Sequence, residues 1–185
     1  TSYTGVVLPG DWDLYKKPYE FDLAYRAVKR LCTESESIDD SEYMYDRFLQ
    51  ELIQQKEGHV ETSKEVIETL RENLLEDGFR TQYELGEKGE AEPVYTESAT
   101  GWGIIVNIGR NGEIIFNNSA HHRLAMSRLL NIDKIPAVVV VRHEQWEEIR
   151  NTIRAAESYE HLDDTTKGYL DHPDVREFVP DGWRT

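Results

Sequence analysis

Several features that would decide the class of a protein are scarce in this sequence. Its 185 residues include a single cysteine, Cys32, which excludes an internal disulfide and a zinc site built mainly from thiolates. No apolar run approaches the roughly 20 residues that a membrane helix needs, and the first residues form no charged-then-apolar leader. We therefore expect a cytoplasmic protein that neither crosses a membrane nor is secreted.

Positive charge is scarce as well. The chain has 21 basic and 36 acidic side chains, which gives it a formal charge of −15. A body with this charge repels duplex DNA, because proteins bind the phosphate backbone mainly through Lys and Arg. We therefore expect no duplex DNA partner, and any anion site must be local. The acidity is typical either of a halophile, since the Debye length is about 3 Å at 1 M salt, or of an ordinary acidic protein.

The first part of the chain has helical periodicity. Two apolar stripes between Pro18 and Lys56 predict an acidic helical hairpin. Capping-box spacing at Thr62 and Glu65 predicts a third helix, which should stop at Asp77-Gly78. A strand is predicted from Phe79 to Leu85.

The pattern changes to short strands after Trp102. Strands are predicted over Gly103–Ile108 and Glu113–Phe116, and the Asn-Gly pair within the intervening Gly109–Gly112 favours the positive φ values of a tight hairpin. The four tryptophans (Trp12, Trp102, Trp146 and Trp183) are expected to pack rather than to stack on a ligand, because no basic groove accompanies them.

The rest of the chain is predicted to alternate helix, strand and helix. Ser119 is the expected N-cap of a helix, and the apolar run Ala137–Val141 predicts a strand buried on both faces. A helix is expected from Trp146 to Ser158, and Pro173 is expected at the first position of a last short helix.

One segment of this acidic chain has a positive balance. Thr100 to Gln145 contains five basic and three acidic residues, so the segment carries +2 and the remainder −17. The predicted helix start lies within it, and a helix start offers unpaired amides and about half a positive charge to a phosphate. We predict a phosphate site formed by Ser119, Ala120, His121, His122 and Arg123.

The chemistry of this site follows from its histidines. The helix dipole should lower the pKa of the first-turn histidines below about 6.5, and a bound phosphate should reverse this effect. Protonated histidine and Arg123 would then donate charge-assisted hydrogen bonds to the phosphate. Alternatively, the histidines are solvated surface and Arg123 only covers apolar helix surface. His121 and His122 diverge by about 100°, so we predict no metal site between them.

Three motifs together resemble the ParB/sulfiredoxin superfamily. They are the helix and glycine of Leu70–Gln82, the helix start Ala120–Ala125, and the Ile-Pro strand Ile135–Val140, within about residues 62–142. The resemblance implies an α+β fold in which a small mixed β-sheet is combined with helices. It divides the chain into a helical N-terminal extension (1–61), a core (62–145), and a C-terminal helix and tail that pack on the core (146–185).

The superfamily includes nucleotide-binding, free-serine kinase and sulfiredoxin branches. His122 and Arg123 match the positions at which the first two branches carry His-Arg or Arg-Arg. His121 falls where sulfiredoxins have their catalytic cysteine, which argues against thiol chemistry here. Ala120 stands where the superfamily prefers glycine.

The resemblance implies that the site binds a nucleotide together with Mg²⁺, nearest in signature to the free-serine kinase branch. His122 is the catalytic candidate, and Asp77 and Glu84 are candidates for a general base. Whether binding is accompanied by phosphoryl transfer or nucleotide hydrolysis is left open by the sequence.

Two other functions remain alternatives. The chain is either a non-enzymatic interaction module, whose acidic hairpin at Pro18–Lys56 docks a protein partner, or a ParB-like nuclease. The nuclease ranks last because the sequence has neither a positively charged groove nor a recognisable set of metal carboxylates.

Overall fold

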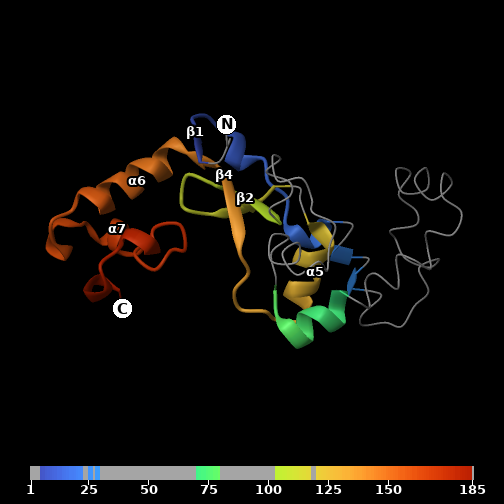
Figure 1. Ribbon diagram of the computed structural model, residues 1–185. Helices are drawn as coiled ribbons and strands as arrows, with labels where there is room; N and C mark the ends of the chain where they lie inside the picture. Colours follow the sequence, from blue (N-terminus) through green and yellow to red (C-terminus); the bar gives the residue numbers. More distant parts are fainter. Residues whose placement is uncertain are drawn as a thin grey trace, which may run out of the picture. The chain divides into compact units, whose positions relative to one another are not determined.

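The computed structural model describes residues 5–22, 25–26, 28–29, 70–79, 103–117 and 120–184. These residues form a four-stranded sheet with the order β1-β4-β2-β3, together with α-helices and short 3₁₀ helices (Figure 1). The elements are β1 (Val6–Leu8), β2 (Ile104–Ile108), β3 (Ile114–Phe116), β4 (Ala137–His143), α5 (His121–Leu129), α6 (Glu144–Ala155), α7 (Asp164–Lys167), and the 3₁₀ helices η1 (Trp12–Leu14), η2 (Tyr19–Phe21), η6 (Tyr159–His161), η7 (Arg176–Phe178) and η8 (Asp181–Trp183). Residues 70–77 form a further helix.

The sheet is mixed. β1 runs parallel to β4, whereas β2 and β3 form a hairpin. A small mixed sheet combined with helices confirms the predicted α+β class. Within the described ranges, no helix has both the length and the apolar character that a membrane span requires.

The chain divides into two compact units. Unit 1 comprises residues 1–16, 106–115 and 139–185, and unit 2 comprises residues 17–105 and 116–138. The predicted phosphate site belongs to unit 2, whereas α6, α7 and the C-terminal segment belong to unit 1. The three-part division implied by the resemblance stays a prediction.

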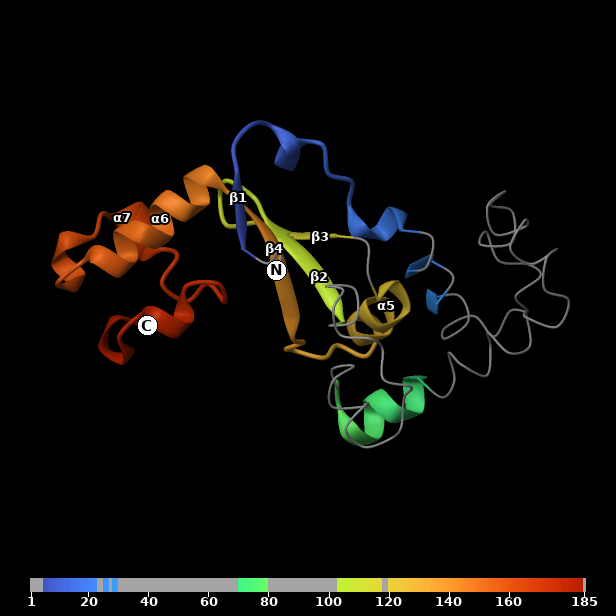
Figure 2. The same cartoon turned by 45° about the horizontal axis from the view of Figure 1, so that its top comes forward.

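β2 and β3 form the hairpin that was predicted over residues 103–116 (Figure 2). The amide of Gly109 donates to the carbonyl of Glu113 at 2.9 Å, and the amide of Gly112 donates to the carbonyl of Gly109 at 3.0 Å. In the Asn111-Gly112 pair only the glycine has a positive φ, of 74°. The loop is therefore a three-residue turn that ends in a left-handed glycine, rather than a two-residue turn with positive φ at both positions.

β4 lies where a strand was predicted, but its predicted burial is wrong. Val138 to Val141 are half-buried and Ala137 is exposed. β2 is the buried strand instead, because its isoleucines and Val106 are at most 6% exposed. β-branched residues favour strand geometry whether or not both faces are covered, so the valines of β4 report strand propensity rather than burial.

The core of unit 2 is built around α5. Ala125 and Met126 of α5 are fully buried, and they cluster with the buried side chains of Val28 and Leu74. Leu74 comes from the helix over residues 70–77. This helix ends at Gly78, which has a φ of 73° and confirms the predicted stop.

α6 begins two residues before the predicted start at Trp146. The reason is a side-chain cap that precedes the helix: Nδ1 of His143 accepts a hydrogen bond from the amide of Gln145 at 3.1 Å. Trp146 is fully buried, which confirms the packing role expected for it.

Pro173 does not start a helix, so that prediction is wrong. It lies in a turn in which the amide of Val175 donates to the carbonyl of His172 at 3.0 Å. The fixed φ of proline suits the second position of such a turn as well as the first position of a helix.

Some predictions fall outside the described residues. They are the second helix of the N-terminal hairpin, most of the predicted strand 79–85, Cys32, Trp102, Glu84 and Ser119.

Candidate functional site

The start of α5 differs from its prediction. The helix begins at His121, and Ala120 occupies the N-cap position with φ 57° and ψ 39°. The prediction of Ser119 as N-cap, with Ala120 in the first turn, is therefore wrong. The chain enters the helix through a left-handed residue, and the methyl side chain of Ala120 supplies no hydrogen bond to the first turn.

His121 is fixed by contacts on several sides. Its Nδ1 lies 2.9 Å from Oδ2 of Asp22, and its ring packs edge-on against Phe116 at a centre distance of 4.9 Å. The hydroxyl of Tyr19 donates to the backbone carbonyl of His121 at 3.2 Å. The imidazole is therefore held by protein groups rather than freely solvated.

Asp22 is a site residue that the sequence analysis missed. Its Oδ1 accepts a hydrogen bond from the amide of Tyr25 at 3.1 Å, which is the geometry of a helix N-cap. Aspartate is among the preferred N-cap residues, so its type is the local signal for this role. Its pairing with His121 spans 99 positions in the sequence, and no local pattern indicates it.

The charged forms of His122 and Arg123 are disfavoured where they lie. The pKa of His122 is below its ordinary value because of burial first and of the neighbouring His121 second, while Asp22 acts in the opposite direction. Burial also lowers the pKa of Arg123, whose guanidinium lies 5.8 Å from the centre of the Phe79 ring. The predicted direction for His122 is confirmed, with burial rather than the helix dipole as its main cause.

The first turn of α5 contrasts with those of α6 and α7. α6 carries Glu144 and Glu147 in its first turn, and α7 carries Asp164 there behind the cap of Asp163. α5 has no acidic residue in its first turn and instead presents two histidines and an arginine. A helix start favours anions and disfavours cations, so the first turn of α5 has the opposite composition to those of α6 and α7.

Arg128 lies near the other end of α5 and has several partners. The guanidinium of Arg128 lies 5.1 Å from the ring centre of Tyr19 and 5.6 Å from that of Tyr25. It also donates to Glu20 at 3.0 Å. A cation near a helix C-terminus is favourable, so this end needs no further partner.

Neither a general base nor a metal site is evident among the described residues. Asp77 is exposed at the end of the helix over residues 70–77. In the ranges that the structure describes, no group of three or more His, Cys, Asp or Glu residues could hold a metal ion.

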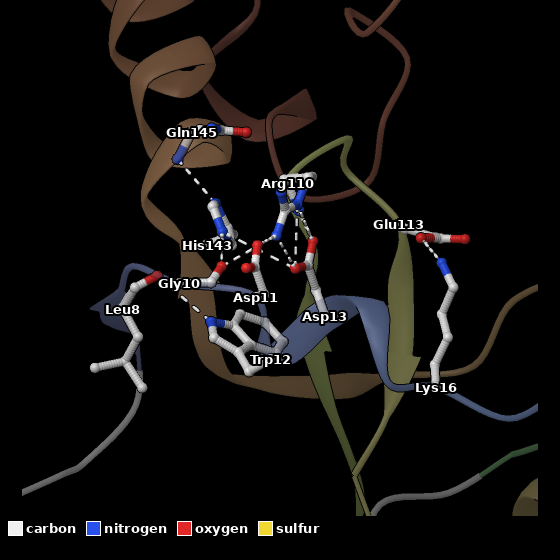
Figure 3. A network of polar contacts seen from close by, with 10 residues as sticks. All are labelled: Leu8, Gly10, Asp11, Trp12, Asp13, Lys16, Arg110, Glu113, His143 and Gln145. Carbon is white, nitrogen blue, oxygen red and sulfur yellow. Dashed lines mark hydrogen bonds and ion pairs between the residues drawn. The ribbon is translucent and has the colours of Figure 1, made fainter.

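Unit 1 contains a polar network that the sequence analysis did not predict (Figure 3). Both carboxylate oxygens of Asp13 accept hydrogen bonds from Arg110, and Oδ2 also accepts from the amide of Arg110 at 2.9 Å. These bonds hold the pKa of Asp13 far below its usual range. The network ties the β2–β3 turn to the segment around η1, and we assign it a structural role because its members satisfy one another.

Comparisons with protein-family models, with curated proteins and with solved structures find no match. The resemblance to the ParB/sulfiredoxin superfamily therefore rests on the sequence motifs alone.

Proposed function

We propose that the start of α5 binds the phosphate groups of a nucleotide or of another phosphate-bearing small molecule. In this proposal the backbone of Ala120 and His121 approaches the phosphate, and the side chains of His122 and Arg123 neutralise it. The resemblance of these positions to nucleotide-binding proteins favours a nucleotide as the ligand.

The observation that carries the proposal is the composition of the first turn of α5. Two histidines and Arg123 occupy the first turn, and burial disfavours the charged forms of His122 and Arg123, in a chain with a net charge of −15. A phosphate at this point would interact favourably with the helix field and with these side chains at once.

The carboxylate of Asp22 places a negative charge on one side of the proposed site. Its carboxylate already accepts from His121, so a phosphate would be repelled by Asp22 and drawn toward His122 and Arg123. For this reason we place the phosphate oxygens nearer to the latter two residues. Asp22→Asn should strengthen binding, because the substitution removes a like charge.

Mg²⁺ enters the proposal only as the counter-ion that a nucleotide brings with it. In the part of the chain that the structure describes, no group of three or more His, Cys, Asp or Glu residues could hold a metal ion at the start of α5. We therefore route no chemical step through the metal. Phosphate release measured in the same mixtures would decide whether binding is accompanied by hydrolysis.

Nucleotide binding is tested by thermal shift and calorimetry with ATP, ADP, CTP and GTP in the presence of Mg²⁺. A ligand present at a hundred times its Kd stabilises the folded state by about 2.7 kcal/mol. Arg123→Ala should weaken binding by about tenfold to a hundredfold, since a hydrogen bond to a charged group contributes about 1.5–3 kcal/mol.

Arg128→Ala is the matched control. It removes the same charge from the same helix, but at the end that Glu20 and two tyrosines already compensate. Its affinity should stay within twofold of the unmodified protein. Equal losses in the two variants would mean that overall charge, and not the start of α5, governs binding.

A protein-interaction module is the second candidate function. It is favoured by exposed apolar side chains just before and at the beginning of the predicted acidic hairpin, because Leu14, Tyr15 and Phe21 are 58%, 86% and 67% exposed. If no nucleotide shifts the melting temperature of folded protein, this candidate replaces the first.

A further inference from the structure

His172 bridges two segments of unit 1. Its Nε2 lies 2.7 Å from the backbone carbonyl of Gly112 in the β2–β3 turn, and its Nδ1 accepts the amide of Asp174 at 3.1 Å. A carbonyl can only accept a hydrogen bond and a backbone amide can only donate one. The ring is therefore neutral, with its proton on Nε2.

The bridge is packed against the buried side chain of Trp146. The centres of the His172 and Trp146 rings are 4.6 Å apart, and Trp146 is fully buried. Gly112 also packs closely here, because a Cβ added to it would lie 2.6 Å from the indole ring. The hydrogen bond between His172 and Gly112 thus joins the β2–β3 turn to the segment 172–174, and both contact the side chain of Trp146.

Charged groups face His172 from its own segment and from α6. The carboxylate of Asp174 favours the protonated form of His172, whereas Arg150 of α6 disfavours it. Arg142 of β4 and Arg150 both pair with Asp174, and Glu147 of α6 pairs with Arg150.

The charged side chains of the β2–β3 turn form ion pairs with residues other than His172. Arg110 pairs with Asp13, and Glu113 pairs with Lys16. The turn therefore presents only the Gly112 carbonyl to His172 among the contacts described here.

Asp174 stays ionised in mild acid. Burial by itself would raise the pKa of Asp174, but hydrogen bonds from Arg142 and Trp146 and the nearby guanidinium charges hold it below its ordinary value. Burial is also the main cause that lowers the pKa of His172. Of the two groups Asp174 and His172, His172 is therefore the one that mild acid protonates.

We propose that His172 is an acid-sensitive latch that joins the β2–β3 turn to the C-terminal segment 172–174. Protonation adds a hydrogen to Nδ1, which then faces the amide hydrogen of Asp174, so the bond between them is lost. The imidazolium must also remain in a half-buried site beside Arg150. Opening relieves both conflicts and uncovers Trp146.

The direction of the pH effect follows from the lowered pKa. In the open state His172 takes up a proton near its ordinary pKa of about 6.5, whereas in the closed state it does so only at lower pH. The latch is therefore closed above about pH 6.5. It weakens as the pH falls through the interval between that value and the pKa of the closed state.

The test uses nuclear magnetic resonance of the full chain between pH 7.5 and pH 5.5. Long-range ¹H–¹⁵N spectra should show the His172 proton on Nε2 at pH 7.5. The hydrogen-exchange protection factor of the Asp174 amide should fall by up to about tenfold per pH unit, the limit for one proton. The amide of Ile153, a buried residue of α6, should keep its protection factor within twofold.

Two variants separate the latch from general acid sensitivity. His172→Gln cannot titrate, so the protection factor of the Asp174 amide should vary less than twofold over this range. His161→Gln removes an exposed histidine of the same unit and should retain the behaviour of the unmodified protein. His143 offers a comparison of ring tautomers within the same molecule. Its Nε2 bonds to the carbonyl of Gly10 and its Nδ1 accepts the amide of Gln145, as the corresponding atoms of His172 do with Gly112 and Asp174.

Several results would overturn the latch. One is a His172 proton on Nδ1 at pH 7.5, and another is a protection factor at Asp174 that changes less than twofold in the unmodified protein. An equal fall at Ile153 would indicate global unfolding instead. Retention of the pH dependence in His172→Gln would assign it to another group. If His172→Gln does not fold, the measurements on the unmodified protein still decide.

Discussion

At the scale of single residues, Gly112 shows how closely two segments approach each other. Its φ is 74°, and a Cβ at this position would lie 2.6 and 2.9 Å from two carbon atoms of Trp146. We expect Gly112→Ala to lower the free energy of unfolding by about 2–4 kcal/mol. This combines the strain of a left-handed alanine with overpacking against a buried ring. Urea unfolding followed by tryptophan fluorescence measures the loss.

Gly78→Ala is the matched control for this prediction. Gly78 has nearly the same φ, 73°, but no atom of the described residues lies within 4 Å of its added Cβ. The control should therefore cost only about 1 kcal/mol, the strain alone. Equal losses at both positions would show that the indole moves aside and that packing contributes little.

Single-residue roles were predictable only where a local pattern encodes them. The sequence predicted the role of Gly78 at the end of the helix over residues 70–77, because few residues other than glycine adopt a left-handed conformation easily. Asp13 and Asp22 act through partners 97 and 99 positions away, and no spacing within either segment indicates these pairs. Their roles arise from the tertiary fold, which a local pattern does not contain.

At the scale of elements, the start of α5 is strained at Ala120, which has the left-handed conformation that glycine adopts easily. Ala120 has φ 57° and ψ 39°, a conformation that costs an alanine about 1–2 kcal/mol. Ala120→Gly should raise the free energy of unfolding by about 1 kcal/mol, even after the larger entropy of the unfolded glycine is counted. Chemical denaturation at constant pH and salt measures the gain.

Asn131→Gly is the comparison for this element. Asn131 also has a positive φ, of 52°, but asparagine tolerates this region better than alanine does. Its replacement should therefore change stability by less than that of Ala120. A larger gain at Asn131 would contradict the assignment of strain to the start of α5.

Elements were predicted better in position than in their ends and burial. β2, β3, β4 and α6 lie where strands and a helix were expected, because periodicity and turn residues are local signals. The start of α6 was misplaced because a histidine caps it, and histidine is not among the preferred caps. The burial of β4 depends on what covers the sheet, which its own residues do not specify.

At the scale of the whole molecule, the excess of acid dominates the response to salt. With 36 acidic and 21 basic side chains, repulsion opposes the compact state, and added salt screens it over about 8 Å at 0.15 M and about 3 Å at 1 M. Exposed pairs such as Arg128–Glu20 weaken in salt, but each contributes only about 0–1 kcal/mol. The side chains of Asp13 and Asp174 are at most 6% exposed, so their pairs are screened much less.

We therefore expect the Tm to rise between 0.1 and 1 M KCl, by about 2–4 °C for each 1 kcal/mol of relieved repulsion in a chain of this size. Differential scanning calorimetry measures this shift in Tm. The pH is held at 7.5 so that His172 stays neutral. Replacing the exposed acids Glu72, Glu76 and Glu157 by glutamine should raise the Tm at low salt and flatten its dependence on KCl. A Tm that falls with KCl would mean that attractive ion pairs outweigh repulsion. An unchanged slope in the triple variant would trace the salt effect to apolar burial, which salts also modulate.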